Sequence, residues 1–186
     1  ETGVAPVVKI MPIKYFDENA SGDVNLKRTI DGLRYAIKMN VDIINYSGGG
    51  PQASKEELEL IKEALNKGIL LVAAAGNESS DTDVPEKQFF PASYNLENII
   101  SVASINPYGH LLKSSNYGLK AIEVAAPGLS IKSTTPDGKF GYMTGTSQAT
   151  AFVSGVSALM LDIFKKKQNT LSKIEMMRLT REGILQ

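Results

Sequence analysis

The chain has 186 residues, and its 20 Lys and Arg residues balance 20 Asp and Glu residues, so the formal net charge is 0. This length corresponds to one domain or to a large piece of one. The charge balance gives no electrostatic reason to expect a nucleic-acid or anionic-membrane partner. The 42% apolar and 22% charged residues are typical of a globular domain. No apolar run approaches the roughly 18 residues that span a bilayer, and the first residues show no signal-peptide pattern.

Two residue counts restrict the chemistry. With 0 Cys, the chain has no disulfides, no zinc–thiolate site and no thiol catalysis. With 1 His, a mechanism that needs two histidines is impossible within the chain. A mechanism that needs one must use His110 or take its base from elsewhere.

Apolar periodicity predicts an alternation of strands and helices. We expect strands at 7–13, 41–46, 69–75, 99–103 and 122–125, and then a hairpin of 131–135 and 140–143. Helices are expected at 25–39, between Ser54 and Gly68, at 147–164, and from Ser172 to about Gly183. Because the near-continuous apolar run 69–75 is typical of a parallel strand covered on both faces, the order of elements indicates an α/β fold.

Three segments stand where function gathers in a parallel α/β sheet, at the carboxyl ends of strands. They are Ser47-Gly48-Gly49-Gly50, Ala74-Ala75-Gly76-Asn77 and Gly145-Thr146-Ser147. The first lacks the spacing and the Lys-Ser/Thr pair of a phosphate-binding loop, so nucleotide binding has little support. The third puts a Ser hydroxyl near the partly positive start of a helix, although taken alone it is also an ordinary helix cap.

Taken together and in order, these segments resemble the subtilisin-like serine proteases, or subtilases. Residues 145–155 resemble the family's nucleophile motif, 72–77 the segment with its oxyanion-hole Asn, and 42–50 its substrate-binding strand. Residues 3–6, 90–93 and 125–128 also fit the family order and spacing. The resemblance covers nearly the whole chain. It implies an α/β fold of three αβα layers with a mainly parallel sheet, incomplete at the N-terminal side.

The resemblance also implies roles for individual residues. Ser147 would be the nucleophile that attacks a peptide carbonyl. The side-chain amide of Asn77 and the backbone N–H of Ser147 would bind the oxyanion that develops. An extended substrate would pair with the exposed backbone as an added strand. The residues implied in substrate binding are Ser47, Gly48, Gly49, Ala74, Ala75, Gly76 and Thr146.

The family's triad Asp and His precede the stretch that matches Gly3-Val4-Ala5-Pro6, and this sequence starts at Glu1. Residues 1–186 are therefore interpreted as a partial catalytic domain that lacks both, with almost no protease activity alone. His110 falls between Asn77 and Ser147 and is interpreted as a surface residue, since position defines a triad. Three explanations stay open: a piece of a cut protease, a shortened form of the domain, or a non-catalytic descendant.

Smaller differences concern specificity and metal binding. Gly48 replaces a larger apolar residue of the family, so the adjoining pocket is expected to be more open. Pro91 matches a family proline that is often cis, which would shape the pocket floor near Phe89 and Phe90. Glu78 favours a basic substrate residue at the pocket rim. No cofactor is implied as required, and Asp81 and Asp83 suggest Ca²⁺ as a structural ion, although two carboxylates are too few to specify a site.

The leading hypothesis is a serine endopeptidase that forms an acyl-enzyme on Ser147. The alternative is a non-catalytic module of the same fold that binds extended peptides. The expected partners are a polypeptide substrate and the absent N-terminal part of the catalytic domain or its propeptide, without nucleic acid or membrane. Family resemblance predicts an extracellular or secretory location.

Overall fold

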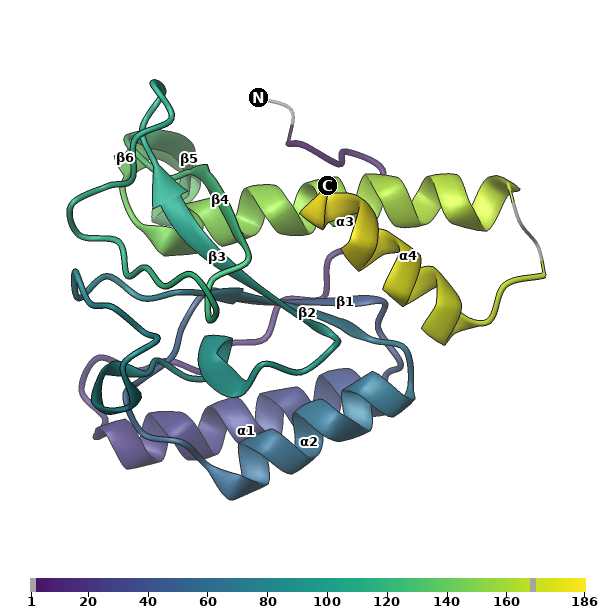
Figure 1. Cartoon of the computed structure of the whole chain (residues 1–186), viewed down its shortest axis with the longest axis horizontal. Coiled ribbons are helices and arrows are strands. Elements are labelled where there is room, and N and C mark those ends of the chain that lie inside the picture. Colours follow the sequence, from purple (N-terminus) through teal and green to yellow (C-terminus); the bar gives the residue numbers. More distant parts are fainter. Residues whose placement is uncertain (1–2, 168–169) are drawn as a thin grey trace.

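A computed structural model describes residues 3–167 and 170–186. Its central layer is a sheet of four parallel strands in the order β1-β2-β3-β4 (Figure 1). The strands are β1 (Ile43–Tyr46), β2 (Leu70–Ala74), β3 (Ile99–Ile105) and β4 (Val124–Pro127). The register places Ile44 of β1 beside Leu71 of β2, and Leu71 beside Ile99 of β3. All four strands therefore end at the same edge of the sheet.

Helices cover both faces of this sheet, as Figure 1 shows. The pair α1 (Gly22–Lys38) and α2 (Lys55–Asn66) lies on one face, and the pair α3 (Thr146–Lys167) and α4 (Lys173–Leu185) lies on the other. An antiparallel hairpin of β5 (Ile131–Thr135) and β6 (Lys139–Met143) precedes α3. The expected three-layer α/β fold with a mainly parallel sheet is confirmed.

Strand β2 explains why one apolar run supports two cores. All five of its residues are buried. Leu71 and Ala73 belong to the core under α1 and α2, whereas Leu70 and Val72 belong to the core under α3 and α4. Side chains alternate between the faces of a strand, so a strand covered on both sides needs apolar residues at every position.

Serine side chains cap the N-terminal ends of α1, α2 and α4. Ser172 and Glu175 form both halves of a capping box at α4. At α2, the Glu57 backbone N–H donates to Ser54 Oγ at 3.3 Å, but the Glu57 carboxylate turns away to accept hydrogen bonds from two tyrosines. The pattern located both helix starts, but only one has the reciprocal bond. Helix α1 begins at Gly22, before the predicted residue 25, because Ser21 caps it.

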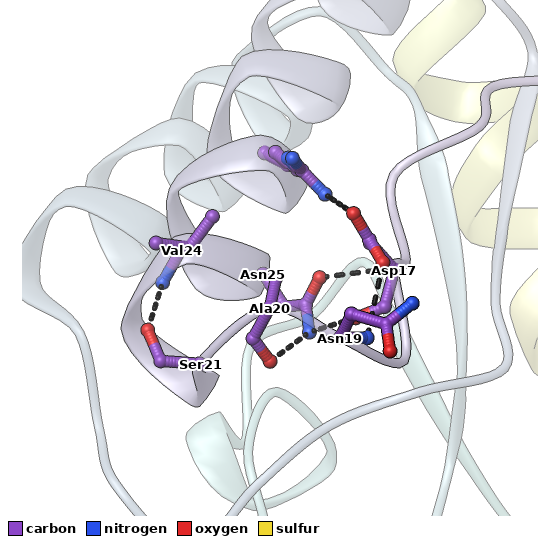
Figure 2. A network of polar contacts seen from close by, with 7 residues as sticks. Asp17, Asn19, Ala20, Ser21, Val24 and Asn25 are labelled. Atoms are coloured by element: carbon purple, nitrogen blue, oxygen red, sulfur yellow. Dashed lines mark hydrogen bonds and ion pairs between the residues drawn. The ribbon is translucent and has the colours of Figure 1, made fainter.

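Figure 2 shows how the loop before α1 is tied to the helix. The side chain of Asn25 forms two 3.0 Å bonds with the backbone of Asp17, accepting from its N–H and donating to its carbonyl oxygen. Arg28 pairs with the Asp17 carboxylate at 3.1 Å. Ser21 Oγ accepts from the Val24 N–H at the helix start. These bonds fix the chain at its entry into the first helical layer.

The prediction of a buried strand at 7–13 is wrong. The segment forms no strand, and Val7 and Ile10 are 84% and 83% exposed. An apolar run becomes a strand only where a neighbouring chain takes up its backbone hydrogen bonds. No ladder in the described part of the chain includes this segment.

We also expected no segment long and apolar enough to span a membrane, and that expectation is wrong. Thr146–Lys166 of α3 has the length and the apolar composition of a membrane-spanning helix, with a mean hydropathy of 1.3. The contacts of α3 give another reason for that composition. The helix packs against β1, β2, β3 and β4 and against α4. Ala149 and Val153 enter the core on this side of the sheet. We therefore interpret α3 as the core helix of that layer.

Candidate active site

The structure brings the three predicted segments together at the carboxyl edge of the sheet. One follows β1, the second follows β2, and the third enters the first turn of α3. Two pairs of contacts, each spanning a large sequence separation, join them. They link Ser47 to Ser147 and Asn77 to Thr146.

Ser147 and Ser47 hold each other by reciprocal hydrogen bonds. Ser147 Oγ donates to the Ser47 carbonyl oxygen at 3.0 Å, and Ser47 Oγ donates to the Ser147 carbonyl oxygen at 3.0 Å. Asn45 Nδ2 donates to Ser47 Oγ at 2.9 Å, and Asn45 Oδ1 accepts from Ser154 Oγ at 2.8 Å. The first turns of α3 are thereby fixed to the end of β1. The Ser147 hydroxyl is held at the end of that strand.

Asn77 is oriented through its carbonyl oxygen. Asn77 Oδ1 accepts from the Thr146 backbone N–H at 3.0 Å and lies 3.3 Å from Thr146 Oγ1. With the oxygen engaged on Thr146, the amide nitrogen carries the two N–H donors of an exposed side chain. Thr146 itself is fully buried. The bond therefore fixes Asn77 to the residue that directly precedes Ser147.

Asn116 is a site-forming residue that sequence reasoning missed. It is 1% exposed, and its Nδ2 donates to the Ala75 carbonyl at 2.8 Å and to Glu78 Oε2 at 2.7 Å. Its Oδ1 accepts from the backbone N–H groups of Glu78 and Ser80, each at 3.0 Å. Every polar atom of this side chain is used to shape the turn that carries Asn77. Asn side chains commonly satisfy turn backbone in this way, which is the only signal that its sequence offers.

The Asn116 contact also changes the expectation for Glu78. A Cβ built on Gly76 would lie 2.4 Å from both Glu78 Oε2 and Asn116 Nδ2. The carboxylate thus lies over Gly76 and is engaged by Asn116. It is less available to a basic substrate residue than a free rim carboxylate would be.

The prediction of an open pocket beside Gly48 is wrong on the side of Tyr15. A Cβ added to Gly48 would lie 2.7 Å from the Tyr15 hydroxyl oxygen. Tyr15 therefore occupies the space that a larger side chain at residue 48 would take. The exchange could not be read from the sequence, because Tyr15 is 33 positions away and belongs to an irregular segment.

Phe90 joins residues 89–91 to the turn after β1. Gly50 and Phe90 form an antiparallel bridge, with the Gly50 N–H to the Phe90 oxygen at 3.0 Å and the Phe90 N–H to the Gly50 oxygen at 2.8 Å. The Phe90–Pro91 peptide bond is cis, as expected for this proline. The bridge holds the segment against the turn after β1.

The carboxylates suggested as calcium ligands accept hydrogen bonds from nearby backbone N–H groups. The Asp83 carboxylate accepts from the backbone N–H groups of Leu119, Lys120 and Ala121 at 2.8–3.1 Å. Burial acts to raise the pKa of Asp83, but these bonds hold it below its usual value. Asp81 Oδ1 accepts from the Asp83 N–H. Among the described residues there is no group of three His, Cys, Asp or Glu side chains that could hold a metal.

His110 is exposed in the turn after β3, as expected of a surface residue. Its backbone N–H donates to Asn106 Oδ1 at 3.0 Å, and its carbonyl accepts from the Asn106 N–H at 2.9 Å. Ser147 Oγ is bonded to the Ser47 carbonyl instead of to an imidazole. The structure does not bring the single histidine into contact with the serine.

Known proteins share both the sequence motifs and this architecture. A family model described as the subtilase family matches residues 1–182. The chain is 41% identical to the Major intracellular serine protease of Bacillus subtilis (strain 168), over 85% of this chain and 48% of that protein. It is 38% identical to Subtilisin E of the same organism, over 86% of this chain and 40% of that protein.

Two solved structures agree. The structure of the prenylagaramide maturation protease PagA has a TM-score of 0.73 at 26% identity, over 91% of this chain and 58% of that chain. The self-cleaved protease domain of PatA has a TM-score of 0.72 at 28% identity, over 83% and 57%.

These matches define the fold class as that of the subtilisin-like proteases. The chain belongs to the subtilase family. It spans about half of the length of the curated relatives named above, or less.

Proposed function

We propose that this chain carries the nucleophile, the oxyanion donors and the pocket walls of a serine endopeptidase. One observation supports the proposal: at the carboxyl edge of the sheet, Ser147 is bonded to Ser47, and Asn77 is bonded to Thr146, the residue before Ser147. The glycine-rich backbone of 47–50 and the 74–76 segment lie next to them as the walls.

In the proposed reaction, Ser147 Oγ forms a bond to the substrate carbonyl carbon while a base takes the hydroxyl proton. The carbonyl oxygen becomes an oxyanion, and the Ser147 N–H and Asn77 amide donate hydrogen bonds to it. Collapse of this intermediate breaks the C–N bond, and the proton passes to the leaving amine. Water then releases the acyl group from Ser147.

The base is proposed to come from outside residues 1–186. By family resemblance, the triad Asp and His precede the stretch that matches 3–6, and His110 is occupied in a turn on the surface. We therefore propose that the isolated chain is inactive and that its partner is the polypeptide carrying these two residues, together with a peptide substrate. The relatives include a protease named as intracellular. Family membership therefore does not fix the compartment, and secretion remains a prediction.

The test is labelling of the full-length native chain with a fluorophosphonate, together with peptide hydrolysis. Ser147→Ala is expected to abolish labelling and to lower kcat by about 10⁶, the loss known for removal of this Ser in a subtilisin. Ser157→Ala is the matched control, because this buried Ser on the same helix only bonds the Val153 carbonyl, and it should keep the label.

A full-length chain that contains the Asp and His but neither labels nor cleaves peptides would overturn the proposal. If such a chain still binds extended peptides, and Ser147→Ala leaves the affinity unchanged, the non-catalytic binding module is the correct function.

A further inference from the structure

The ring of Phe89 lies between the two glycine walls of the proposed site. A Cβ built on Gly49 would lie 2.4 Å from Phe89 Cε1, and one built on Gly76 would lie 3.0 Å from Phe89 Cδ2. Opposite edges of one ring therefore contact the turn after β1 and the turn after β2. Both glycines have positive φ, 153° and 98°, and neither has room for a side chain while the ring is present.

The backbone on both sides of the ring is fixed. The Phe89 N–H donates to Ser93 Oγ at 3.1 Å, and the Phe89 carbonyl accepts from the Ser93 N–H at 2.9 Å. The next residue, Phe90, is bridged to Gly50 by two backbone bonds. These bonds fix the backbone that carries the ring, and the contacts with Gly49 and Gly76 place the ring between the two turns. Phe89 as a whole residue is partly buried.

We infer that Phe89 is the floor of the substrate side-chain pocket and restricts the residue before the cleaved bond to a small side chain such as Ala, Ser or Gly. This rests on the proposed function. Two glycines facing each other without side chains would leave a slot wide enough for a large apolar side chain. Here an aromatic ring of the protein itself takes that volume, so a substrate Phe or Leu would have to displace it.

The inference is tested on the full-length native enzyme with two peptide nitroanilides that differ only in Ala or Phe before the cleaved bond. The wild-type enzyme is expected to favour Ala in kcat/KM by about tenfold or more, the scale of discrimination by pocket volume. Phe89→Ala is expected to raise kcat/KM for the Phe peptide by about tenfold or more and to change the Ala peptide little.

Phe90→Leu is the matched control. The Phe90 ring packs against Tyr94 at a tilt, with centroids 4.7 Å apart, so replacing it with Leu should leave the Ala-to-Phe ratio unchanged. Phe89→Val is a second variant for the case that Phe89→Ala does not fold, because it keeps an apolar contact with both glycines but gives up the ring. Equal rates for both peptides in the wild type, or a ratio that the Phe89 variants leave unchanged, overturn the inference.

A binding experiment separates this inference from the proposed function. Calorimetry on Ser147→Ala in the full-length chain compares peptides that end in Ala or Phe at the carboxyl terminus. If the native enzyme cleaves nothing, the proposed function fails. The role of Phe89 in limiting the size of the bound side chain is then supported if Phe89→Ala selectively improves binding of the Phe-terminated peptide, and it fails if that affinity does not change.

Discussion

Of the two side chains expected to do chemistry, Asn77 is held by an atom that the proposed reaction does not use. Asn77 is fixed through its carbonyl oxygen, which leaves its N–H groups for an oxyanion. Ser147, at the start of α3, is held through its own carbonyl by Ser47 Oγ, but its hydroxyl also donates to the Ser47 carbonyl, and that bond is given up when a base takes the proton. Preorganised donors such as the Asn77 amide stabilise a developing negative charge without rearranging at the moment of reaction.

The Asn77 oxygen and the Asn77 N–H groups have separate roles, and this gives a prediction. Asn77→Asp keeps an oxygen that accepts from Thr146 but loses the N–H donors, whereas Asn77→Ala loses both. In the full-length enzyme both variants should lose about 10²–10³ in kcat with little change in KM, the loss known for a subtilisin oxyanion donor. Steady-state kinetics of the two variants measure it. An Asn77→Asp enzyme with wild-type kcat would show that the amide donates to no oxyanion.

Asn116 is predicted to set the shape of the Asn77 turn. Asn116→Ala leaves the N–H groups of Glu78 and Ser80 and the Ala75 carbonyl without their partner, and should cost about 1–3 kcal/mol for unsatisfied buried groups. It should also lower kcat in the full-length enzyme. Thermal unfolding and kinetics measure the two effects.

Asn106→Ala is the control for Asn116→Ala. Asn106 accepts from the N–H groups of Tyr108 and His110 in the turn after β3, so its loss disturbs a turn of the same kind away from Asn77. It should leave kcat unchanged. Equal loss of kcat in both variants would contradict a specific role for Asn116.

Sequence reasoning located Ser147, Asn77 and the glycine walls because each belongs to a short contiguous motif. It could not find Asn116, whose partner Glu78 is 38 positions away. Tyr15 was missed for the same reason, whereas the resemblance had already placed the pocket floor near Phe89. Their effect comes from which glycine they face, and that is a property of the folded chain.

At the scale of elements, β1 and α2 are joined by a buried carboxylate. Glu57 is 2% exposed and accepts from the Tyr46 hydroxyl at 2.6 Å and the Tyr94 hydroxyl at 2.9 Å. Burial raises the pKa of Glu57, although both bonds act to lower it. Burial, and then the adjacent carboxylate, also raise the pKa of both tyrosines.

The raised pKa of Glu57 predicts how stability changes with pH. Since the folded state holds the Glu57 proton more tightly than the unfolded state, this group contributes stability below its unfolded pKa and loses that contribution as pH rises through the folded pKa. Urea unfolding at a series of pH values above the ordinary pKa of Glu should therefore include a component that falls with rising pH.

Glu57→Gln should remove that component. A Gln amide can donate to the Tyr94 hydroxyl while that hydroxyl donates to the Ser54 carbonyl, 3.0 Å away, so the variant should be at least as stable at neutral pH. Glu59→Gln is the control, because the exposed Glu59 has its pKa lowered by Lys62. A pH dependence in Glu57→Gln identical to that of the wild type would refute the assignment.

The elements themselves were predicted best where the pattern is self-contained. The helices and the β5–β6 hairpin have local caps, turns and periodicity, and only their ends moved by a few residues. The 7–13 segment failed because a strand is completed by a partner, and apolar residues alone do not say where that partner is.

At the scale of the whole molecule, Lys173 connects elements from opposite faces of the sheet. Its Nζ donates from the start of α4 to the carbonyls of Asn40 and Val41 and to Asn40 Oδ1, at 2.7–3.0 Å. These acceptors follow the C-terminal end of α1, where positive charge is favourable. Burial lowers the pKa of this ammonium group, but it satisfies three oxygens.

Lys173→Met is predicted to keep the aliphatic stem and lose these bonds. We expect a loss of about 1–2 kcal/mol, at the low end for bonds to charged groups because the site is partly exposed. Lys166→Met is the control, because the exposed Lys166 pairs only with Asp162 on its own helix. Denaturant unfolding of both variants measures the difference. Equal small losses would mean that Lys173 does not join the two layers.

The contact between Ser47 and Ser147 spans 100 positions of the chain. The pocket walls come from the first half of the sequence and the nucleophile from the second half. If the proposed function is correct, the ribosome synthesises the residues of the peptide-binding sheet edge well before it synthesises the nucleophile, Ser147. Cleavage begins only after α3 has been synthesised and has packed on the sheet. An incompletely synthesised chain therefore does not cleave neighbouring proteins.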